Sequence, residues 1–269
     1  MQSKRVLSIQ DVSCLGQCSL TIALPVISAC GVETCILPSA LLSTHTMGFK
    51  DYTCLDLTSE MKNILAHWEK ENILFDAVYT GYLATGEQID VVREVFDTRL
   101  KDGGLKIVDP VMGDFGKLYP AFDGNFVKDM RRLVGCADIV LPNITEASYL
   151  TETEYKENYD EAYVDNLLKE LISLGAKKVV LKGVGYKNDT TGVVVYDGKD
   201  KYYYSHPRIE RSCHGTGDLF ASAFTGLIMS GKSVNEAVVA SADFVVRCIE
   251  NTDGTHWYGV NFEPLLKTL

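Results

Sequence analysis

The stretch KIVDPVMGD, residues 106–114, carries the pattern that decides the fold of this chain. A short apolar, β-branched run comes first, and a turn with a proline, a glycine and two aspartates follows it at once. Runs of this kind recur between longer amphipathic stretches, which is the alternation of strands and helices typical of a parallel sheet. Most of the runs are too continuously apolar to have a face in water, so helices should cover both faces of the sheet. The predicted strands are residues 6–10, 34–38, 77–80, 106–108, 138–141 and 178–181.

The amphipathic stretches between these runs have the apolar spacing of α-helices, and several have a recognisable start. Thr85 with Gln88, and Ser233 with Glu236, have the spacing of a capping box, in which two side chains exchange hydrogen bonds with the backbone of the first turn. The predicted helices are residues 58–71, 87–100, 160–174, 219–229 and 233–250.

Two segments depart from this alternation. Asp197 and Gly198 form a strong turn signal between the runs 192–196 and 201–205, which predicts an antiparallel hairpin. Residues 151–159 are polar and are predicted to form a surface loop. The sequence has no internal repeat, low-complexity linker or break in composition. We therefore predict a single domain over residues 1–269, a three-layer α/β/α sandwich with a mostly parallel central sheet and a small antiparallel hairpin.

Composition narrows the classes of function. Of the 269 residues, 46% are hydrophobic and 23% are charged, which is close to the average of globular proteins. No apolar run approaches the ~18 residues that cross a bilayer, and the first residues do not resemble a secretion signal, so we expect a cytoplasmic protein without a membrane partner. The net charge of -10 disfavours a nucleic-acid partner. The eight cysteines include no CxxC pair, so they predict neither disulfides nor a zinc site.

Polar side chains gather where the predicted strands end. The carboxyl ends of parallel strands lie along one rim of the sheet, and ligands of open α/β sheets bind there. We therefore expect the polar residues of these turns to share one rim. They are Asp11, His45, Thr46, Tyr82, Asp109, Asp114, Asn143, Glu146 and Lys182.

Four of these residues have a structural explanation beside the functional one. Asn143 and Glu146 have the spacing of a capping box, which explains them as well as ligand binding does. Asp109 and Asp114 could form the turn around Pro110, since aspartate favours such positions. They could equally hold Mg²⁺, which binds one or two carboxylates together with water and phosphate oxygens.

Three further residues are similarly open. Lys182 is either a solvated lysine at a strand end or a positive charge that neutralises phosphate. His45 fits a hydrogen-bonded structural histidine equally well, and we assign it no proton transfer. Tyr82 fits a packed wall of a site better than a catalyst.

The stretch RSCHGTGDLF, residues 211–220, leads into the apolar helix predicted at 219–229. Gly215, Thr216 and Gly217 therefore lie at a helix N-terminus, where free N–H groups and the helix dipole attract an anion. Glycine lets the backbone approach that anion closely. Asp218 complements the dipole, but a carboxylate beside an anion site makes better sense as a base that takes a proton from an attacking hydroxyl.

Other functions of this stretch have less support. It lacks the third glycine of GxGxxG and does not follow the first strand, and GxxxxGK[ST] is absent from the chain. Cys213 and His214 are adjacent in sequence, a spacing that rarely allows the histidine to act as a base for the cysteine.

Several motifs resemble those of a known family. Residues 215–218, GTGD, resemble the anion-hole and catalytic-base motif of the ribokinase-like superfamily. Residues 109–119 resemble the DPVMGDxGxLY segment of the vitamin B6 kinases, the pyridoxal and pyridoxamine kinases. The resemblance spans nearly the whole chain, because further matches occur in the same order at residues 8–10, 43–46, 81–83, 87–88, 137–139, 142–143 and 146.

This resemblance implies an ATP-dependent kinase that phosphorylates the 5′-hydroxymethyl group of pyridoxal, pyridoxamine or pyridoxine. By resemblance, Asp218 is the base, and the backbone amides of the residues before it stabilise charge on the transferred phosphoryl group. Those residues are Gly215, Thr216 and Gly217. Relatives are commonly homodimers, so a homodimer is also implied.

The resemblance also assigns the ATP, metal and ring contacts. Asn143, Lys182 and Glu146 match positions that bind ATP. Asp114 and Glu146 match positions that handle Mg²⁺, and Asp109 lies where relatives contribute to a site for a monovalent cation, K⁺ or Na⁺. The pyridine ring of the substrate would contact Thr46 and Tyr82.

One position departs from the B6 kinase pattern. Many of these kinases have SIQSH at the end of the first strand, whereas this chain has SIQDVS, residues 8–13. Asp11 and Ser13 resemble instead the D-P-S of hydroxymethylpyrimidine kinases, which share the fold. Asp11 could accept a hydrogen bond from a ring hydroxyl, a pyridinium nitrogen or an exocyclic amine.

Three alternatives to a B6 kinase therefore remain. A hydroxymethylpyrimidine kinase fits Asp11, but that family usually has a cysteine at the position of Asp218. Another small-alcohol or sugar kinase of the superfamily fits the GTGD motif alone. A non-catalytic vitamer-binding protein fits the fold, although the chain retains every catalytic-type residue.

Overall fold

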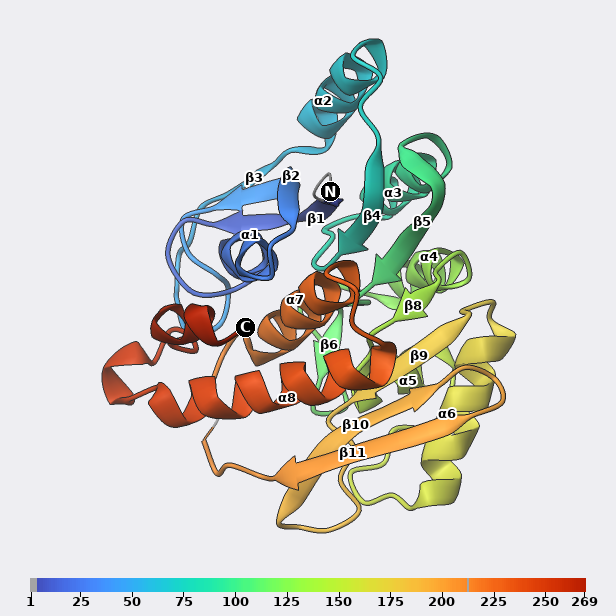
Figure 1. The fold of residues 1–269 in the computed structure, drawn as a ribbon, viewed down its shortest axis with the longest axis vertical. Helices are drawn as coiled ribbons and strands as arrows, with labels where there is room; N and C mark the ends of the chain where they lie inside the picture. Colours follow the sequence, from blue (N-terminus) through green and yellow to red (C-terminus); the bar gives the residue numbers. More distant parts are fainter. Residues whose placement is uncertain (1–3, 212) are drawn as a thin grey trace.

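The structure is a computed structural model that describes residues 4–211 and 213–269 (Figure 1). Its strands are β1 (Arg5–Ser13), β2 (Glu33–Leu42), β3 (Cys54–Asp56), β4 (Phe75–Thr80), β5 (Leu100–Val108), β6 (Gly113–Asp114), β7 (Lys117–Leu118), β8 (Ile139–Val140), β9 (Lys178–Lys182), β10 (Thr190–Tyr196) and β11 (Lys201–Pro207). Its helices are α1 (Leu20–Ala29), α2 (Thr58–Lys70), α3 (Gly86–Thr98), α4 (Gly124–Val134), α5 (Ile144–Leu150), α6 (Glu161–Ser173), α7 (Thr216–Met229), α8 (Val234–Asn251) and the short 3-10 helices η1 (Gly254–His256) and η2 (Glu263–Thr268). None of the helices in the two described ranges combines the length and the apolar character needed to cross a bilayer.

Nine of the described strands form one sheet in the order β11-β10-β9-β8-β5-β4-β1-β2-β3. The neighbours from β9 to β2 run parallel, whereas β3, β10 and β11 pair antiparallel with their neighbours. The predicted mostly parallel sheet is thus confirmed. The predicted hairpin is confirmed as β10 and β11, and it extends the main sheet because β10 also pairs with β9. β6 and β7 form a separate two-stranded antiparallel sheet.

Helices cover both faces of the main sheet, because successive side chains of a strand point to opposite sides. Leu7 of β1 and Val78 of β4 pack in an apolar cluster with α3, α4 and α6. Val6 and Ala77, one position earlier in each strand, pack on the other face with α1, α7 and α8. In Figure 1, α7 and α8 cross in front of the sheet and α3 and α4 lie behind it. The predicted three-layer α/β/α arrangement is confirmed.

The differences from the predicted elements include one helix end, the helices α1 and α4, which were not predicted, and the short strands β3, β6 and β7, which were not predicted either. The helix expected at 87–100 ends as α3 at Thr98, because Leu100 already pairs with Phe75 and begins β5. α1 has no counterpart among the predicted helices. It contains Pro25, which cannot donate the backbone hydrogen bond of a helix interior.

The predicted helix starts differ in how completely they are capped. At α8, Ser233 and Glu236 form both hydrogen bonds of the capping box. At α3, the Thr85 side chain accepts from the Gln88 N–H, but the Gln88 side chain accepts from the Ala84 N–H at 2.8 Å and not from Thr85. The capping box predicted there is therefore only half formed. The predicted surface loop at 151–159 contains neither helix nor strand.

Candidate functional site

A buried ion pair lies at the rim where the parallel strands end. Lys182, the last residue of β9, places its Nζ 2.8 Å and 2.7 Å from the two carboxylate oxygens of Asp109, which directly follows β5. A Cβ atom built on Gly217 would lie 3.9 Å from the Lys182 Nζ, so the start of α7 meets the same point. Three segments that are far apart in sequence therefore converge at this rim, as the strand-end rule predicts.

The environment of this pair keeps Lys182 charged. The Asp109 side chain is 1% exposed and that of Lys182 is 14% exposed. Burial by itself lowers the pKa of Lys182, but the carboxylates of Asp109 and Glu146 outweigh it and raise that pKa above its usual value. The simpler interpretation of Lys182 as a solvated lysine is wrong, because the side chain is buried and paired. A buried charge of this kind can neutralise phosphate.

Asn143 and Glu146 form the capping box of α5, and both of its hydrogen bonds are present. The same side chains also hold the loop after β5. The Asn143 Nδ2 donates to the Gly113 carbonyl at 2.9 Å, and the Glu146 Oε1 accepts from the Met112 N–H at 3.3 Å. Burial, followed by the charge of Asp109, raises the pKa of Glu146 to about 8. The structural role of both residues is therefore present in full.

Asp114 begins a tight turn between β6 and β7. The two central residues of the turn, Phe115 and Gly116, have φ values of 49° and 74°, as in the hairpin turns that need left-handed residues. A Cβ atom on Gly116 would lie 2.5 Å from the Tyr155 ring, so only glycine fits there. The Asp114 Oδ1 accepts from the Phe115 N–H at 2.9 Å, and the residue is exposed. The turn-forming role of Asp114 is thus present, and its second oxygen faces no hydrogen-bond donor of the described residues.

The carboxylates of this rim do not form a metal cage by themselves. Among residues 4–211 and 213–269, no group of three His, Cys, Asp or Glu side chains is arranged to hold a metal ion. Both oxygens of Asp109 are engaged by Lys182. Mg²⁺ at phosphate-transfer sites usually takes one or two carboxylates and completes its shell with water and phosphate oxygens. Asp114 and Glu146 suit that kind of binding and not an all-protein site.

Asp218 lies in the first turn of α7, and its carboxylate is held from one side. Its Oδ2 accepts from the Ser19 backbone N–H at 3.1 Å. Burial, with the negative charges of Asp109 and Asp11, raises the pKa of Asp218 to about 7, although the Ser19 hydrogen bond and Lys182 oppose the rise. A carboxylate that titrates near neutral pH suits general-base catalysis. The sequence motif did not reveal Ser19, because a backbone amide leaves no residue-type signal.

The glycine before α7 is required by the local backbone. Gly215 has a φ of 81° and is the N-cap of the helix, and a Cβ atom there would lie 2.0 Å from the Gln17 carbonyl oxygen. The loop before α1 is thus in direct contact with the GTGD motif. Binding of an anion by the first amides of α7 stays a prediction from the sequence.

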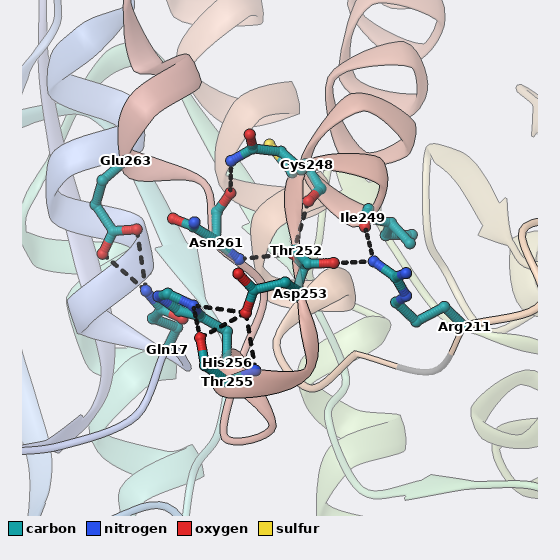
Figure 2. A network of polar contacts seen from close by, with 11 residues as sticks. Gln17, Arg211, Cys248, Ile249, Thr252, Asp253, Thr255, His256, Asn261 and Glu263 are labelled. Atoms are coloured by element: carbon teal, nitrogen blue, oxygen red, sulfur yellow. Dashed lines mark hydrogen bonds and ion pairs between the residues drawn. The ribbon is translucent and has the colours of Figure 1, made fainter.

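The C-terminal part of the chain holds the two segments of the contact between Gln17 and Gly215 in place (Figure 2). The Arg211 guanidinium donates to the carbonyls of Ile249 and Thr252 at the end of α8, where a cation complements the helix dipole. The Gln17 Nε2 donates to Glu263 at 2.8 Å, across 246 residues of sequence. No role is predicted from the sequence for residues 252–263, because no local motif marks them as part of the site.

The other end of the rim contains Asp11. The pairing of β1 with β2 shifts register here, because Gln10 pairs with Pro38 and Val12 with Leu41, so β2 has one extra residue opposite Asp11. Asp11 is buried, and its Oδ2 accepts from the Ser13 hydroxyl at 3.1 Å. Burial raises the pKa of Asp11, and the Ser19 and Ser13 hydroxyls oppose the rise. Ser19 therefore contacts both Asp11 and Asp218.

His45 is a structural histidine. Its Nε2 lies 2.5 Å from the Tyr258 carbonyl oxygen, and its Nδ1 accepts from the Met47 N–H at 3.1 Å. This pair of contacts requires the neutral ring with the proton on Nε2. Both ring nitrogens of His45 are thus engaged by backbone groups, which agrees with the prediction that His45 transfers no proton. Thr46, its neighbour, is exposed at the edge of the same loop.

Tyr82 is part of an aromatic wall. Its ring lies 5.4 Å from that of Phe122, and the residue is half-buried. Burial raises the pKa of Tyr82 to about 12, so the hydroxyl stays protonated at neutral pH. These features agree with the interpretation of Tyr82 as a packed wall.

Cys213 and His214 contribute no reactive pair. Burial raises the pKa of the Cys213 thiol. Burial, together with His45 at a ring distance of 5.5 Å, lowers the pKa of His214, so its imidazole is neutral. All eight cysteines are free. The assignment of the chemistry of the motif to Gly215, Thr216, Gly217 and Asp218 stays a prediction.

Comparisons with known proteins show the family of the chain. The model of the family described as phosphomethylpyrimidine kinase matches residues 23–260. The hydroxymethylpyrimidine/phosphomethylpyrimidine kinase of Aquifex aeolicus is 30% identical over 185 residues, which are 68% of this chain and 70% of that protein.

Solved structures extend the match to the whole chain. A Bacteroides thetaiotaomicron protein assigned to the phosphomethylpyrimidine kinases has a TM-score of 0.94 at 35% identity, over 100% of this chain and 94% of that chain. The same protein was also crystallised with pyridoxal. Pyridoxal kinase from Lactobacillus plantarum has a TM-score of 0.90 at 30% identity, over 98% of this chain and 96% of that chain. These relatives are kinases, and their names refer to two different substrates.

Proposed function

The chain belongs to the phosphomethylpyrimidine kinase family, whose structural relatives are ribokinase-like kinases, and from this premise we propose that it is a vitamin B6 kinase. It transfers a phosphoryl group from ATP to the 5′-hydroxymethyl group of pyridoxal, pyridoxamine or pyridoxine. The observation that carries the proposal is Asp218, a carboxylate with a pKa of about 7 at the mouth of a helix whose first amides can receive an anion.

Asp218 acts as the base for the acceptor hydroxyl. The Ser19 N–H holds its Oδ2, which leaves Oδ1 to accept the proton from the hydroxymethyl group. The amides of Gly215, Thr216 and Gly217 stabilise the charge that spreads over the transferred phosphoryl group. Lys182, charged and next to Gly217, adds positive charge on the side of the phosphates.

ATP and Mg²⁺ fit the neighbouring strand ends. Asn143, Lys182 and Glu146 would contact the phosphates of ATP. Asp114 and Glu146 would hold Mg²⁺, in part through water, and Asp109 would contribute to a site for K⁺ or Na⁺. Bound Mg²⁺ would neutralise charge on the phosphate oxygens.

Two observations favour a B6 vitamer as the acceptor. The Bacteroides relative was crystallised with pyridoxal, and the Lactobacillus plantarum relative is a pyridoxal kinase. Asp11, buried at the register shift between β1 and β2, can accept a hydrogen bond from the ring, while Thr46 and Tyr82 border the same end of the site. Asp218 counts against a hydroxymethylpyrimidine kinase, because that family usually has a cysteine at this position.

A hydroxymethylpyrimidine kinase is the second candidate. The family model carries that name, and the Aquifex relative is a hydroxymethylpyrimidine/phosphomethylpyrimidine kinase. Asp11 could accept from the exocyclic amine of the pyrimidine just as it could from a pyridine substituent. Another small-alcohol or sugar kinase of the superfamily is the third and has less support.

A substrate panel tests the proposal. The purified chain is incubated with MgATP and, separately, pyridoxal, pyridoxamine, pyridoxine, hydroxymethylpyrimidine and ribose, and ADP release is measured. We expect the highest kcat/KM with one of the three vitamers. Turnover of hydroxymethylpyrimidine without turnover of any vitamer would replace the proposal by the second candidate.

A further inference from the structure

Three polar side chains are buried together beneath the rim. Gln10 on β1, Tyr79 on β4 and Ser222 on α7 are each 0% exposed. Their Gln10 Oε1, Tyr79 OH and Ser222 Oγ atoms have no hydrogen-bond partner at normal geometry among the residues that the structure describes. Buried polar atoms are nearly always paired in folded proteins, so a cluster of three in one place calls for a physical reason.

The three side chains meet on one face of the sheet. Ser8 and Tyr79 are paired positions of β1 and β4, and Gln10 lies two residues beyond Ser8, so all three point to the side covered by α7. The Gln10 Nε2 donates to the Ser8 hydroxyl at 2.9 Å, which fixes the amide and turns its Oε1 away from Ser8. A Cβ atom on Gly81 would lie 2.4 Å from that Oε1, so the amide also lies directly beneath the end of β4.

The Tyr79 hydroxyl lies between the other two groups. Burial, and then the charges of Asp109 and Asp218, raise the pKa of Tyr79 well above its usual value, so it stays protonated. The side chains of Ser222 and Gln10 are near enough to the hydroxyl to oppose that rise. Ser222 can donate to Tyr79, and Tyr79 can donate to Gln10, whose oxygen only accepts. This order satisfies all three groups after small rotations.

Each member of this cluster is next to a residue of the proposed site. Gln10 immediately precedes Asp11, and Ser222 lies four residues after Asp218, on the same face of α7. Tyr79 lies on β4, two residues before Gly81 and three before Tyr82. We propose that Gln10, Tyr79 and Ser222 form a buried hydrogen-bonded network, which we call the tie, between β1, β4 and α7. The tie sets the position of Asp218 relative to Asp11. Tyr79 and Ser222 are therefore positioning residues for the acceptor hydroxyl.

This proposal rests on the proposed function for its kinetic part, and the chain offers a matched control. Ser241 of α8 also has a fully buried Oγ without a partner among the described residues, but its helix carries no residue of the site. If buried hydroxyls matter here only for packing, Ser222→Ala and Ser241→Ala should behave alike, and Tyr79→Phe should keep full activity.

Kinetics of the full chain on the best substrate of the panel provide the first test. Tyr79→Phe and Ser222→Ala should each lower kcat by about tenfold and leave the KM for ATP unchanged, because small displacements of reacting groups are costly. The double variant should lose little more than the stronger single variant, since both break one network. Ser241→Ala should keep the kcat of the original chain. Unchanged kcat in Tyr79→Phe and Ser222→Ala would overturn the tie.

Amide hydrogen exchange, read by mass spectrometry, tests the tie without any substrate. Tyr79→Phe should speed exchange in peptides that contain residues 8–13 and 79–82, whereas Ser241→Ala should not. If no alcohol is phosphorylated, the proposed function fails, and this measurement still decides the tie. Exchange in Tyr79→Phe that matches the original chain at both strand ends contradicts it.

Discussion

The two ends of the site are held in different ways. The end proposed to bind the phosphates, which we call the phosphate end, contains Asp109, Lys182 and Asp218 from two strand ends and α7. Electrostatic interactions between these buried groups connect them. The end proposed to bind the ring of the substrate, which we call the ring end, contains the loop of His45 and Thr46. His45 is held there by a backbone carbonyl of the C-terminal segment, and Thr46 is exposed. Charge interactions are stronger where water is excluded. The position of a loop that is held by backbone contacts depends instead on how well its side chains fit against their neighbours. Changes of charge should therefore damage the first end most, and changes of shape the second.

The largest effect is expected from Asp218→Asn. The amide keeps the size of the side chain but cannot take the proton of the acceptor, so turnover should fall by roughly two or more orders of magnitude. ATP binding should stay nearly intact, because the GTG amides are unchanged. Steady-state kinetics and nucleotide titration measure the two quantities, and comparable activity in the variant would refute the role of Asp218 as base.

Lys182→Met should have the next largest effect, on stability as well as turnover. It leaves Asp109, which is 1% exposed, as a buried charge without its partner. Breaking such a pair costs about 3–5 kcal/mol of the free energy of unfolding. Turnover should also fall, by about a hundredfold, since a charge that stabilises the phosphates is lost.

A double variant separates these two consequences of losing Lys182. Lys182→Met with Asp109→Leu replaces both charges by apolar groups and should recover most of the free energy of unfolding, while turnover stays low. Denaturant unfolding with activity assays would measure both. Recovery of activity along with stability would mean that Lys182 serves only the fold.

The pH dependence sharpens the contrast at the phosphate end. The pKa of Asp218 is raised from its usual value of 3.8 to about 7, so kcat/KM should rise with pH and level off above about 7. Because the folded chain holds this proton more tightly than the unfolded chain does, protonation of Asp218 increases the free energy of unfolding. That stability is present below about 4 and is lost as the pH rises through about 7. Asp218→Asn should remove the pH dependence and melt at a higher temperature than the original chain at pH 8; equal melting temperatures would contradict the raised pKa.

The phosphate end was also the easier end to predict. Its strands are apolar throughout, and glycine, aspartate and lysine mark their ends, so local sequence is sufficient to place Asp109, Asn143, Lys182 and Asp218 on one rim. Local sequence does not show which of them pair. Lys182 and Asp109 are 73 residues apart, and only the strand order brings them together.

At the ring end, Asp11, Thr46 and Tyr82 were named from the sequence, but the contacts that support this end were not predicted. Its supports are backbone groups, such as the Met47 N–H and the Tyr258 carbonyl that hold His45, and a backbone group leaves no signal of residue type in the sequence. β3 was missed because its three residues are all exposed and have no apolar pattern. The C-terminal segment joins the site only through the tertiary fold.

Gly16→Ala should damage the ring end alone. Gly16 has a φ of +107°, and a Cβ atom there would lie 2.2 Å from the His45 Cδ2, so His45 must move and loosen its contact with Tyr258. The KM for the vitamer should rise by about tenfold, while kcat and the KM for ATP change little.

Gly31→Ala is the matched control for Gly16→Ala. Gly31 also has a positive φ, +79°, but an added Cβ would meet nothing within 4 Å. It carries the same kind of backbone strain without the clash, so it should lower stability and leave the KM for the vitamer unchanged. If both variants raised that KM alike, backbone strain and not the position of His45 would control the ring end.

The smallest effect is expected from Asp11→Asn, which keeps shape and removes charge at the end that we expect to depend on shape. The amide oxygen can still accept from the ring and from the Ser13 hydroxyl, so the KM for the vitamer should rise only severalfold, with kcat retained. Because burial raises the pKa of Asp11, the original chain should bind the vitamer more weakly as the pH falls, and the variant should not show this dependence. Initial rates over a range of vitamer concentrations at several pH values measure both. A loss as large as that of Asp218→Asn would show that the ring end also depends on charge, and the contrast between the two ends would fail.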